Sequence, residues 1–72
     1  MKSIIIGAGD VGLNIARHLV LENRDVVVID SSAERLAVVN ETVDVQTIHG
    51  RGSHPDVLER AGAGNADMLI AV

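Results

Sequence analysis

Three glycines near the start of the chain have the spacing of a phosphate-binding turn. Gly7, Gly9 and Gly12 follow the apolar residues 4–6 and form the pattern G-x-G-x-x-G. We expect Gly7 to allow a tight turn out of a strand, Gly9 to let a pyrophosphate approach the backbone, and Gly12 to let the following helix pack closely. The N–H groups at the start of that helix would face the phosphates. Because a glycine triplet alone is a weak signal, this interpretation depends on the strand, the helix and a downstream acid around it.

Asp30 is that acid. It ends the apolar run 26–29 and lies eighteen positions after Gly12, close to the roughly 20 residues expected. A carboxylate there can accept hydrogen bonds from both ribose hydroxyls of an adenosine, and it would repel a 2′-phosphate. The pattern therefore favours NAD(H) or a plain adenine nucleotide over NADP(H). The alternative is that Asp30 is only a strand-end acid or the N-cap of the next helix.

Two arginines and a serine are further candidate ligands. Arg35 lies five residues after Asp30 and could stack on adenine, meet a phosphate, or be a solvated helix charge. Arg51 lies between two glycines on a loop at the expected ligand side of the sheet, where crevices at strand carboxyl ends bind ligands. Ser31 directly follows Asp30, so we expect it at the same site and also as the cap of the next helix.

Other reactive residue types do not form a recognisable centre. His49, His54 and Asp56 match no standard metal-binding spacing. No serine has a histidine and an acid arranged for nucleophilic catalysis. We therefore expect neither a metal site nor a catalytic residue.

Composition limits the possible classes of protein. The chain has 72 residues, which is one small domain, and 47% of them are hydrophobic. The net charge of −4 and the absence of aromatic residues argue against nucleic acid as a partner. The lack of cysteine excludes a disulfide framework and fits a reducing cytoplasm. No segment is long and apolar enough for direct membrane insertion, and residues 1–3 do not resemble a signal peptide.

Periodicity predicts alternating strands and helices. Strands are expected at 2–6, 25–29, 44–48 and 67–72, and helices at about 10–22, from Ser31 to residue 40, and at 54–61. In the first helix, Val11, Ile15 and Leu19 form one apolar stripe. Ser31 and Ser53 each begin a sequence typical of a capping box, with an acid three residues later.

This order of elements predicts an α/β fold with a doubly wound, Rossmann-like parallel sheet. Right-handed crossovers give the strand order 3-2-1-4 with helices on both faces. Only the first half of such a fold is expected in residues 1–72, truncated after the fourth strand. Ala71 and Val72, at the end of that strand, could contact the ribose or adenine. Residues 68–72 would form an apolar sheet edge, so we expect self-association there.

With these motifs placed, the chain resembles the N-terminal nucleotide-binding domain of bacterial Trk potassium-uptake regulators, in the KTN/RCK family. The resemblance covers essentially all 72 residues. The glycine triplet is shared with many dehydrogenases, whereas the later stretches are more particular to this family. The resembling segments are 1–12, Asp30 with residues 34–35, 50–58 and 61–72.

The resemblance implies a regulatory subunit, not an enzyme, that binds NAD(H), with ATP and ADP as further candidates. It implies a partner, a membrane potassium transporter that the subunit gates, a homo-oligomer (dimer or tetramer), and a cytoplasmic location at the inner face of the plasma membrane. By position, the phosphate loop comprises Gly7, Gly9, Asp10, Val11 and Gly12; Asp30 is the ribose ligand, and Arg35 flanks the adenosine. Many family members have an acid at the position of Arg51, so any role of that acid is in doubt here. Arg51 could instead supply a cation near adenine or phosphate.

Three other interpretations use the same residues. The chain could be the N-terminal half of an NAD-dependent oxidoreductase, whose catalytic residues would lie beyond residue 72. It could belong to a methyltransferase, although the third glycine favours a dinucleotide. It could also be a structural domain with an unoccupied crevice.

Overall fold

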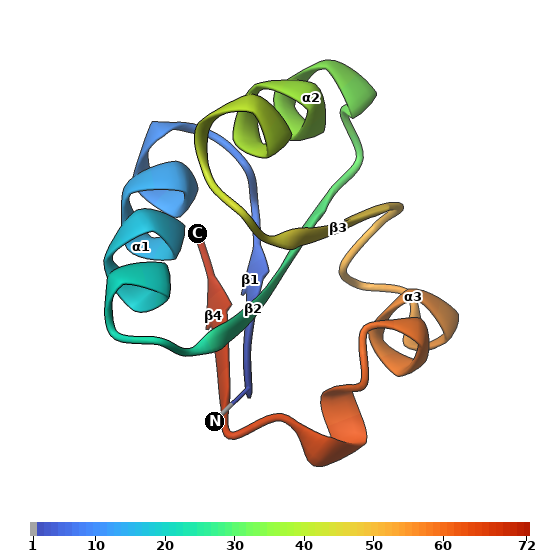
Figure 1. Cartoon of the computed structure of the whole chain (residues 1–72). Helices are drawn as coiled ribbons and strands as arrows, with labels where there is room; N and C mark the ends of the chain where they lie inside the picture. The colour runs from blue at the N-terminus through green and yellow to red at the C-terminus, as the bar shows by residue number, and fades with distance from the viewer. Residues whose placement is uncertain (1) are drawn as a thin grey trace.

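The computed structural model describes residues 2–72, so Met1, which begins the first resembling segment, lies outside the described residues. A four-stranded sheet lies between two layers of helices (Figure 1). Helices α1 (Asp10–Leu21) and α2 (Ala33–Thr42) cover one face, and α3 (Pro55–Arg60) with the short 3-10 helix η1 (Ala63–Asn65) covers the other. The strands are β1 (Lys2–Ile6), β2 (Asp25–Asp30), β3 (Gln46–His49) and β4 (Met68–Ala71).

The strand order is β3-β2-β1-β4 and every neighbouring pair is parallel. The predicted α/β fold and the order 3-2-1-4 are therefore confirmed. In the register, Ile6 of β1 lies beside Ile29 of β2 and Ala71 of β4, while Asp30 lies beside His49. The carboxyl ends of all four strands consequently meet at one edge of the sheet.

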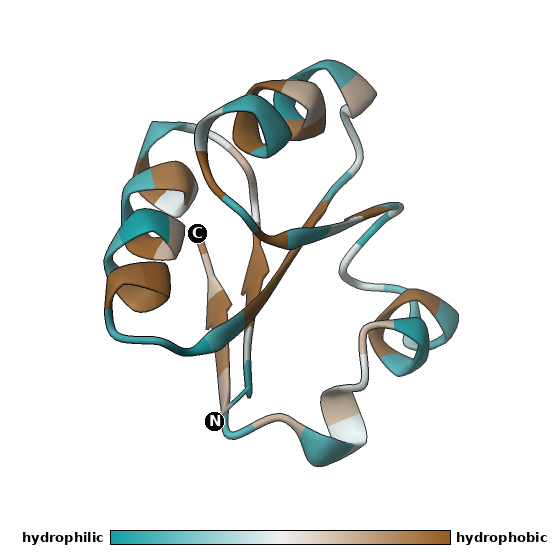
Figure 2. Cartoon of the chain, in the orientation of Figure 1, coloured by the Kyte–Doolittle hydropathy of each residue, from teal (hydrophilic) through white to brown (hydrophobic). Residues whose placement is uncertain are grey.

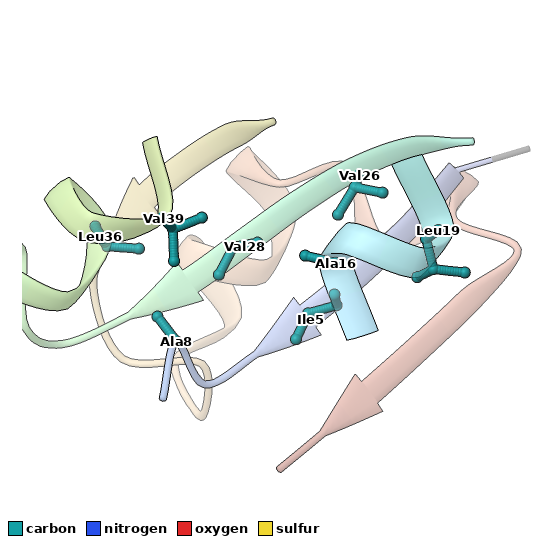
Figure 3. Close-up of a cluster of buried hydrophobic side chains, with 8 residues drawn as sticks. All are labelled: Ile5, Ala8, Ala16, Leu19, Val26, Val28, Leu36 and Val39. Atoms are coloured by element: carbon teal, nitrogen blue, oxygen red, sulfur yellow. The ribbon is translucent and has the colours of Figure 1, made fainter. Parts of the chain in front are cut away.

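The two central strands are apolar on both faces because both faces are covered by helices. Alternate residues of β1 and β2 face opposite layers: Ile5 and Val28 pack toward α1 and α2, whereas Ile4 and Ile29 pack toward α3. Figure 2 shows the hydrophobic colour along these two strands, whereas the helices carry both hydrophobic and hydrophilic colours. The side chains of the larger cluster are drawn in Figure 3.

Helix α1 buries Leu19 of the predicted apolar stripe and packs Ile15 against the core, but it leaves Val11 exposed. Gly12, Ala16 and Leu19 are its buried residues, whereas Val11 is 61% exposed. The small residues face inward because the helix lies close to the glycine turn. Val11 is thereby left at the surface, beside the carboxyl edge of the sheet.

The predicted helix caps are wrong in both capping boxes. The N-cap of α2 is Ser32, not Ser31, and its hydroxyl accepts the Arg35 N–H at 3.3 Å. The shift follows from Asp30, whose carboxylate accepts the Ser32 N–H and so fixes the turn one residue later. The N-cap of α3 is His54 rather than Ser53, and no side chain of the described residues caps it, although Pro55 lies in the first turn as expected.

The connection into β4 contains a short 3-10 helix that the sequence did not predict. Gly62 has a φ of 82°, which ends α3, and η1 follows it. Asp67 then aligns β4 with β1, because its carboxylate accepts the Lys2 N–H and its own N–H donates to the Lys2 carbonyl, both at 2.8 Å. Within residues 2–72, no helix is long and apolar enough to cross a membrane.

Candidate functional site

The three glycines after β1 differ in what surrounds them. Gly7 has a φ of 120°, and a Cβ on it would lie 2.7 Å from the carbonyl oxygen of Val72. A Cβ on Gly12 would overlap the Gly7 carbonyl. By contrast, a Cβ on Gly9 would meet no described atom within 4 Å. Gly7 and Gly12 are thus required by the packing of the chain itself, whereas Gly9 borders open space.

Gly9 is also the N-cap of α1, and among residues 2–72 no side chain caps this helix. The first N–H groups of an α-helix have no partner inside the helix, so they are available to an anion. The open space at Gly9 therefore lies beside backbone donors. This is the arrangement that the glycine spacing predicted for a phosphate group.

Asp30 connects the glycine turn to the start of α2. One carboxylate oxygen accepts the Ala8 N–H at 3.0 Å, and the other accepts the Ser32 N–H at 2.8 Å. Asp30 is partly buried, and an ionised carboxylate has about four acceptor positions. Asp30 is thus an acid at the end of β2 with a structural role, but it is not the N-cap of α2, which is Ser32. Each carboxylate oxygen keeps an acceptor position for a ligand.

Two hollows of about 360 Å³ each lie on either side of Asp30. We call the one beside the glycine turn the glycine-loop hollow, and the one beside Arg51 the Arg51 hollow. Both are lined by Gly7, Asp30 and Val72. The glycine-loop hollow is lined in addition by Gly9, Asp10, Val11, Gly12 and Arg35. The Arg51 hollow is lined in addition by Ile6, Ile29, Ser31, Gly50, Arg51, Gly52 and Ser53.

All nine residues predicted for the site therefore line at least one of these two hollows. The two arginines are separated, with Arg35 beside the glycine turn and Arg51 on the other side of Asp30. Of the two residues considered at the end of β4, Val72 lines both hollows. Ala71 is not among the lining residues.

Sequence reasoning considered His49 only as a metal ligand and missed its contact with the turn after β2. Its Nε2 lies 2.9 Å from the carbonyl oxygen of Ser31, so it links the end of β3 to the turn after β2. The signal that could have identified it is the register of neighbouring parallel strands, which puts His49 beside Asp30. Its imidazole is thus engaged with the backbone. Within the part of the chain that the structure describes, no three acidic, histidine or cysteine side chains could hold a metal ion.

A larger hollow, of about 440 Å³, lies at the opposite edge of the sheet. We call it the amino-end hollow because it is lined by the first residues of β1, β2 and β3. Its charged side chains are two bases and two acids: Lys2, Arg24, Asp25 and Asp44. We assign the candidate site to the other edge, because ligands of open parallel sheets bind at the carboxyl ends of the strands.

A parallel sheet in this order, with a glycine turn after β1 and an acid at the end of β2, defines a Rossmann-type nucleotide-binding fold. The sequence model of the TrkA-N domain matches residues 3–72, and the chain belongs to the TrkA-N domain family. The resemblance to Trk potassium-uptake regulators is thereby confirmed.

Two named relatives support the same family assignment. The chain is 50% identical to the Trk system potassium uptake protein TrkA of Vibrio alginolyticus and 51% identical to that of Azorhizobium caulinodans. In both comparisons all of this chain is covered but only 16% of the relative, so the chain spans about one sixth of their length. These relatives are named for potassium uptake and not for a reaction.

A solved structure confirms the fold. The TrkA-N domain of the inner membrane protein ybaL from Escherichia coli superimposes with a TM-score of 0.86, at 24% identity. The match covers 97% of this chain and 51% of that one.

Proposed function

We propose that residues 1–72 are the N-terminal portion of an RCK-type domain that binds NAD(H) and adenine nucleotides in a regulatory subunit of a potassium uptake system. One observation carries the nucleotide-binding part: Asp30 lies between two hollows, one of which borders open space at Gly9 beside an uncapped helix start. The potassium-uptake part rests on the family and on the names of the relatives. Those names favour this interpretation over the oxidoreductase alternative.

The geometry supports one orientation of the ligand. The ribose hydroxyls donate to the free acceptor positions of Asp30, the phosphates lie against the N–H groups at Gly9 to Gly12, and the adenine occupies the Arg51 hollow. Arg35 then meets a phosphate, because it lines the glycine-loop hollow. Arg51 lies beside the adenine, with Ser31 and Val72. A 2′-phosphate would meet the Asp30 carboxylate, so NADP(H) binds more weakly.

Ligand binding acts on a partner through differential affinity for two arrangements of the assembly. The partner is a membrane potassium transporter, which the subunit gates from the cytoplasmic side, at the inner face of the plasma membrane. The subunit itself is a homo-oligomer, either a dimer or a tetramer. This part of the proposal rests on the family. The chain carries out no chemical reaction.

The test is isothermal titration of the protein with NADH, ATP and NADPH, comparing the wild type with Asp30→Ala and Asp30→Asn. Both substitutions remove a charged acceptor of the ribose that NADH and ATP share, so affinity for both ligands should fall roughly 10- to 100-fold. Glu41→Gln is the matched control, because Glu41 is an exposed acid near the end of α2 that lines neither hollow.

Asp30 also holds the Ala8 and Ser32 amides, so circular dichroism must first establish that each variant is folded. Asp30→Asn keeps an amide oxygen that can accept one of these bonds. Unchanged affinity for both nucleotides in a folded variant would remove Asp30 from the site. Failure of the wild type to bind any adenine nucleotide would contradict the proposed function.

A further inference from the structure

The charged side chains lining the glycine-loop hollow are two acids and one base. The acids are Asp10 and Asp30, and the base is Arg35. Both oxygens of Asp30 already accept backbone N–H groups. Asp10 is exposed, and across residues 2–72 its carboxylate has no hydrogen-bond or ion-pair partner. The charge of Asp10 therefore acts on whatever enters the hollow.

Asp10 is the first residue of α1, directly after Gly9. A helix N-terminus favours any anion, so the Asp10 carboxylate and a bound phosphate share the same favourable region and repel each other. An internal phosphodiester carries a single negative charge, whereas a terminal phosphate carries about two at pH 7. The pyrophosphate of a dinucleotide thus brings less negative charge near Asp10 than ADP does, and much less than ATP.

Apolar surface in the glycine-loop hollow also favours a dinucleotide over ATP. Val11 is 61% exposed and lines the glycine-loop hollow. A second nucleoside, which continues beyond the pyrophosphate of a dinucleotide, can cover apolar surface. The terminal phosphate of ATP would lose hydration against it, and Arg35 is the one base lining the hollow that could offset this loss.

From these observations we infer that Asp10 is a specificity-determining residue, which makes the glycine-loop hollow favour a dinucleotide over a nucleoside triphosphate. The inference rests on the proposed function and adds to it the ligand class, ranked by the charge of the phosphate chain. Arg35, the single base of the hollow, partly offsets the two acids. The expected order of affinity is NADH, then ADP, then ATP.

The experiment measures the affinities of NADH, ADP and ATP for the protein and for Asp10→Asn at low salt. Removing one negative charge near the phosphates should raise the affinity for ATP roughly five- to tenfold, and that for NADH about twofold or less. The gain for ATP should shrink in about 0.5 M salt, because exposed charges are then screened. The ratio of the ATP and NADH affinities is the deciding quantity.

Asp56→Asn is the matched control, because Asp56 is also an exposed acid in the first turn of a helix but does not line the hollow. Asp10→Ser is a second variant that keeps a side chain favourable at a helix start. Binding of the nucleotides with an unchanged ATP-to-NADH ratio in both Asp10 variants would overturn the inference and leave the proposed function intact. Absence of all nucleotide binding in the wild type would overturn both.

Discussion

The two edges of the sheet differ in chemistry although both carry a hollow. The amino-end hollow is the larger, at about 440 Å³ against about 360 Å³ for each hollow at the carboxyl edge. It is lined by two acids and two bases. One of these bases is Arg24, whose Nε lies 3.7 Å from Oε1 of Glu22. At the carboxyl edge, α1 and α2 begin, and Asp30 joins the turn after β1 to the turn after β2.

The direction of the chain explains this difference. In a parallel sheet, every helix that follows a strand begins at the carboxyl edge, so its free N–H groups collect there. The C-terminal ends of α1 and α2 return to the amino edge, where carbonyl groups are left over and anions are disfavoured. The position of an anion-binding site in such a fold thus depends on chain direction more than on the size of a hollow.

The largest expected effect comes from filling the closest contact at the carboxyl edge. Gly12→Ala should lower the free energy of unfolding by about 3 kcal/mol, because the new Cβ would overlap the Gly7 carbonyl. Urea denaturation followed by far-UV circular dichroism measures this loss. Gly64→Ala, in η1 before β4, is the control and should change stability by less than about 0.5 kcal/mol, because its Cβ has space. Equal losses of unfolding free energy in the two variants would contradict this prediction.

An intermediate effect is expected at Gly9, on binding and not on stability. Gly9→Ala places a methyl group in the open space beside the helix start, where the proposed pyrophosphate lies. Affinity for NADH should fall at least about tenfold, a loss of about 1.4 kcal/mol. The free energy of unfolding should change by about 1 kcal/mol or less. Titration and urea denaturation of the same sample measure both quantities. A variant that binds NADH as well as the wild type would mean that no ligand approaches Gly9.

The smallest effect should come from the amino edge. Asp44→Asn changes the charge of the amino-end hollow, which lies at the other end of the strands from Asp30. We expect the affinities for NADH and ATP to stay within about twofold of the wild type, because an exposed charge beyond the Debye length is screened. Titration at physiological salt measures this. A change as large as that in Asp30→Asn would place a ligand at the amino edge instead.

Much of the fold could be predicted because local signals agree with one another. The uninterrupted apolar runs of β1 and β2 indicate buried parallel strands, and the glycine turn marks where the first strand ends. The helix caps could not be predicted, because Ser31 and Ser32 are adjacent and equally suitable. The choice between them depends on which amide the Asp30 carboxylate accepts, which is a tertiary detail.

The candidate site was predictable by residue type but not by arrangement. Glycine spacing and the acid after β2 identify the carboxyl edge from sequence alone. Both arginines follow strands that end at this edge, so the sequence left each of them free to meet adenine or phosphate. Only the packed structure separates Arg35 from Arg51 on opposite sides of Asp30. The exposure of Val11 could not be predicted either, because helical periodicity assigned this residue to the buried stripe.

The contact between Gly7 and Val72 limits which amino acid can stand at position 7. A Cβ on Gly7 would approach the carbonyl oxygen of Val72, which is a backbone atom. Every amino acid at position 72 presents the same oxygen, so no substitution there can make room for a side chain at position 7. The two positions touch, yet a change at one cannot be rescued by a change at the other. Position 7 is therefore fixed as glycine by the geometry of the main chain, whichever residue stands at position 72.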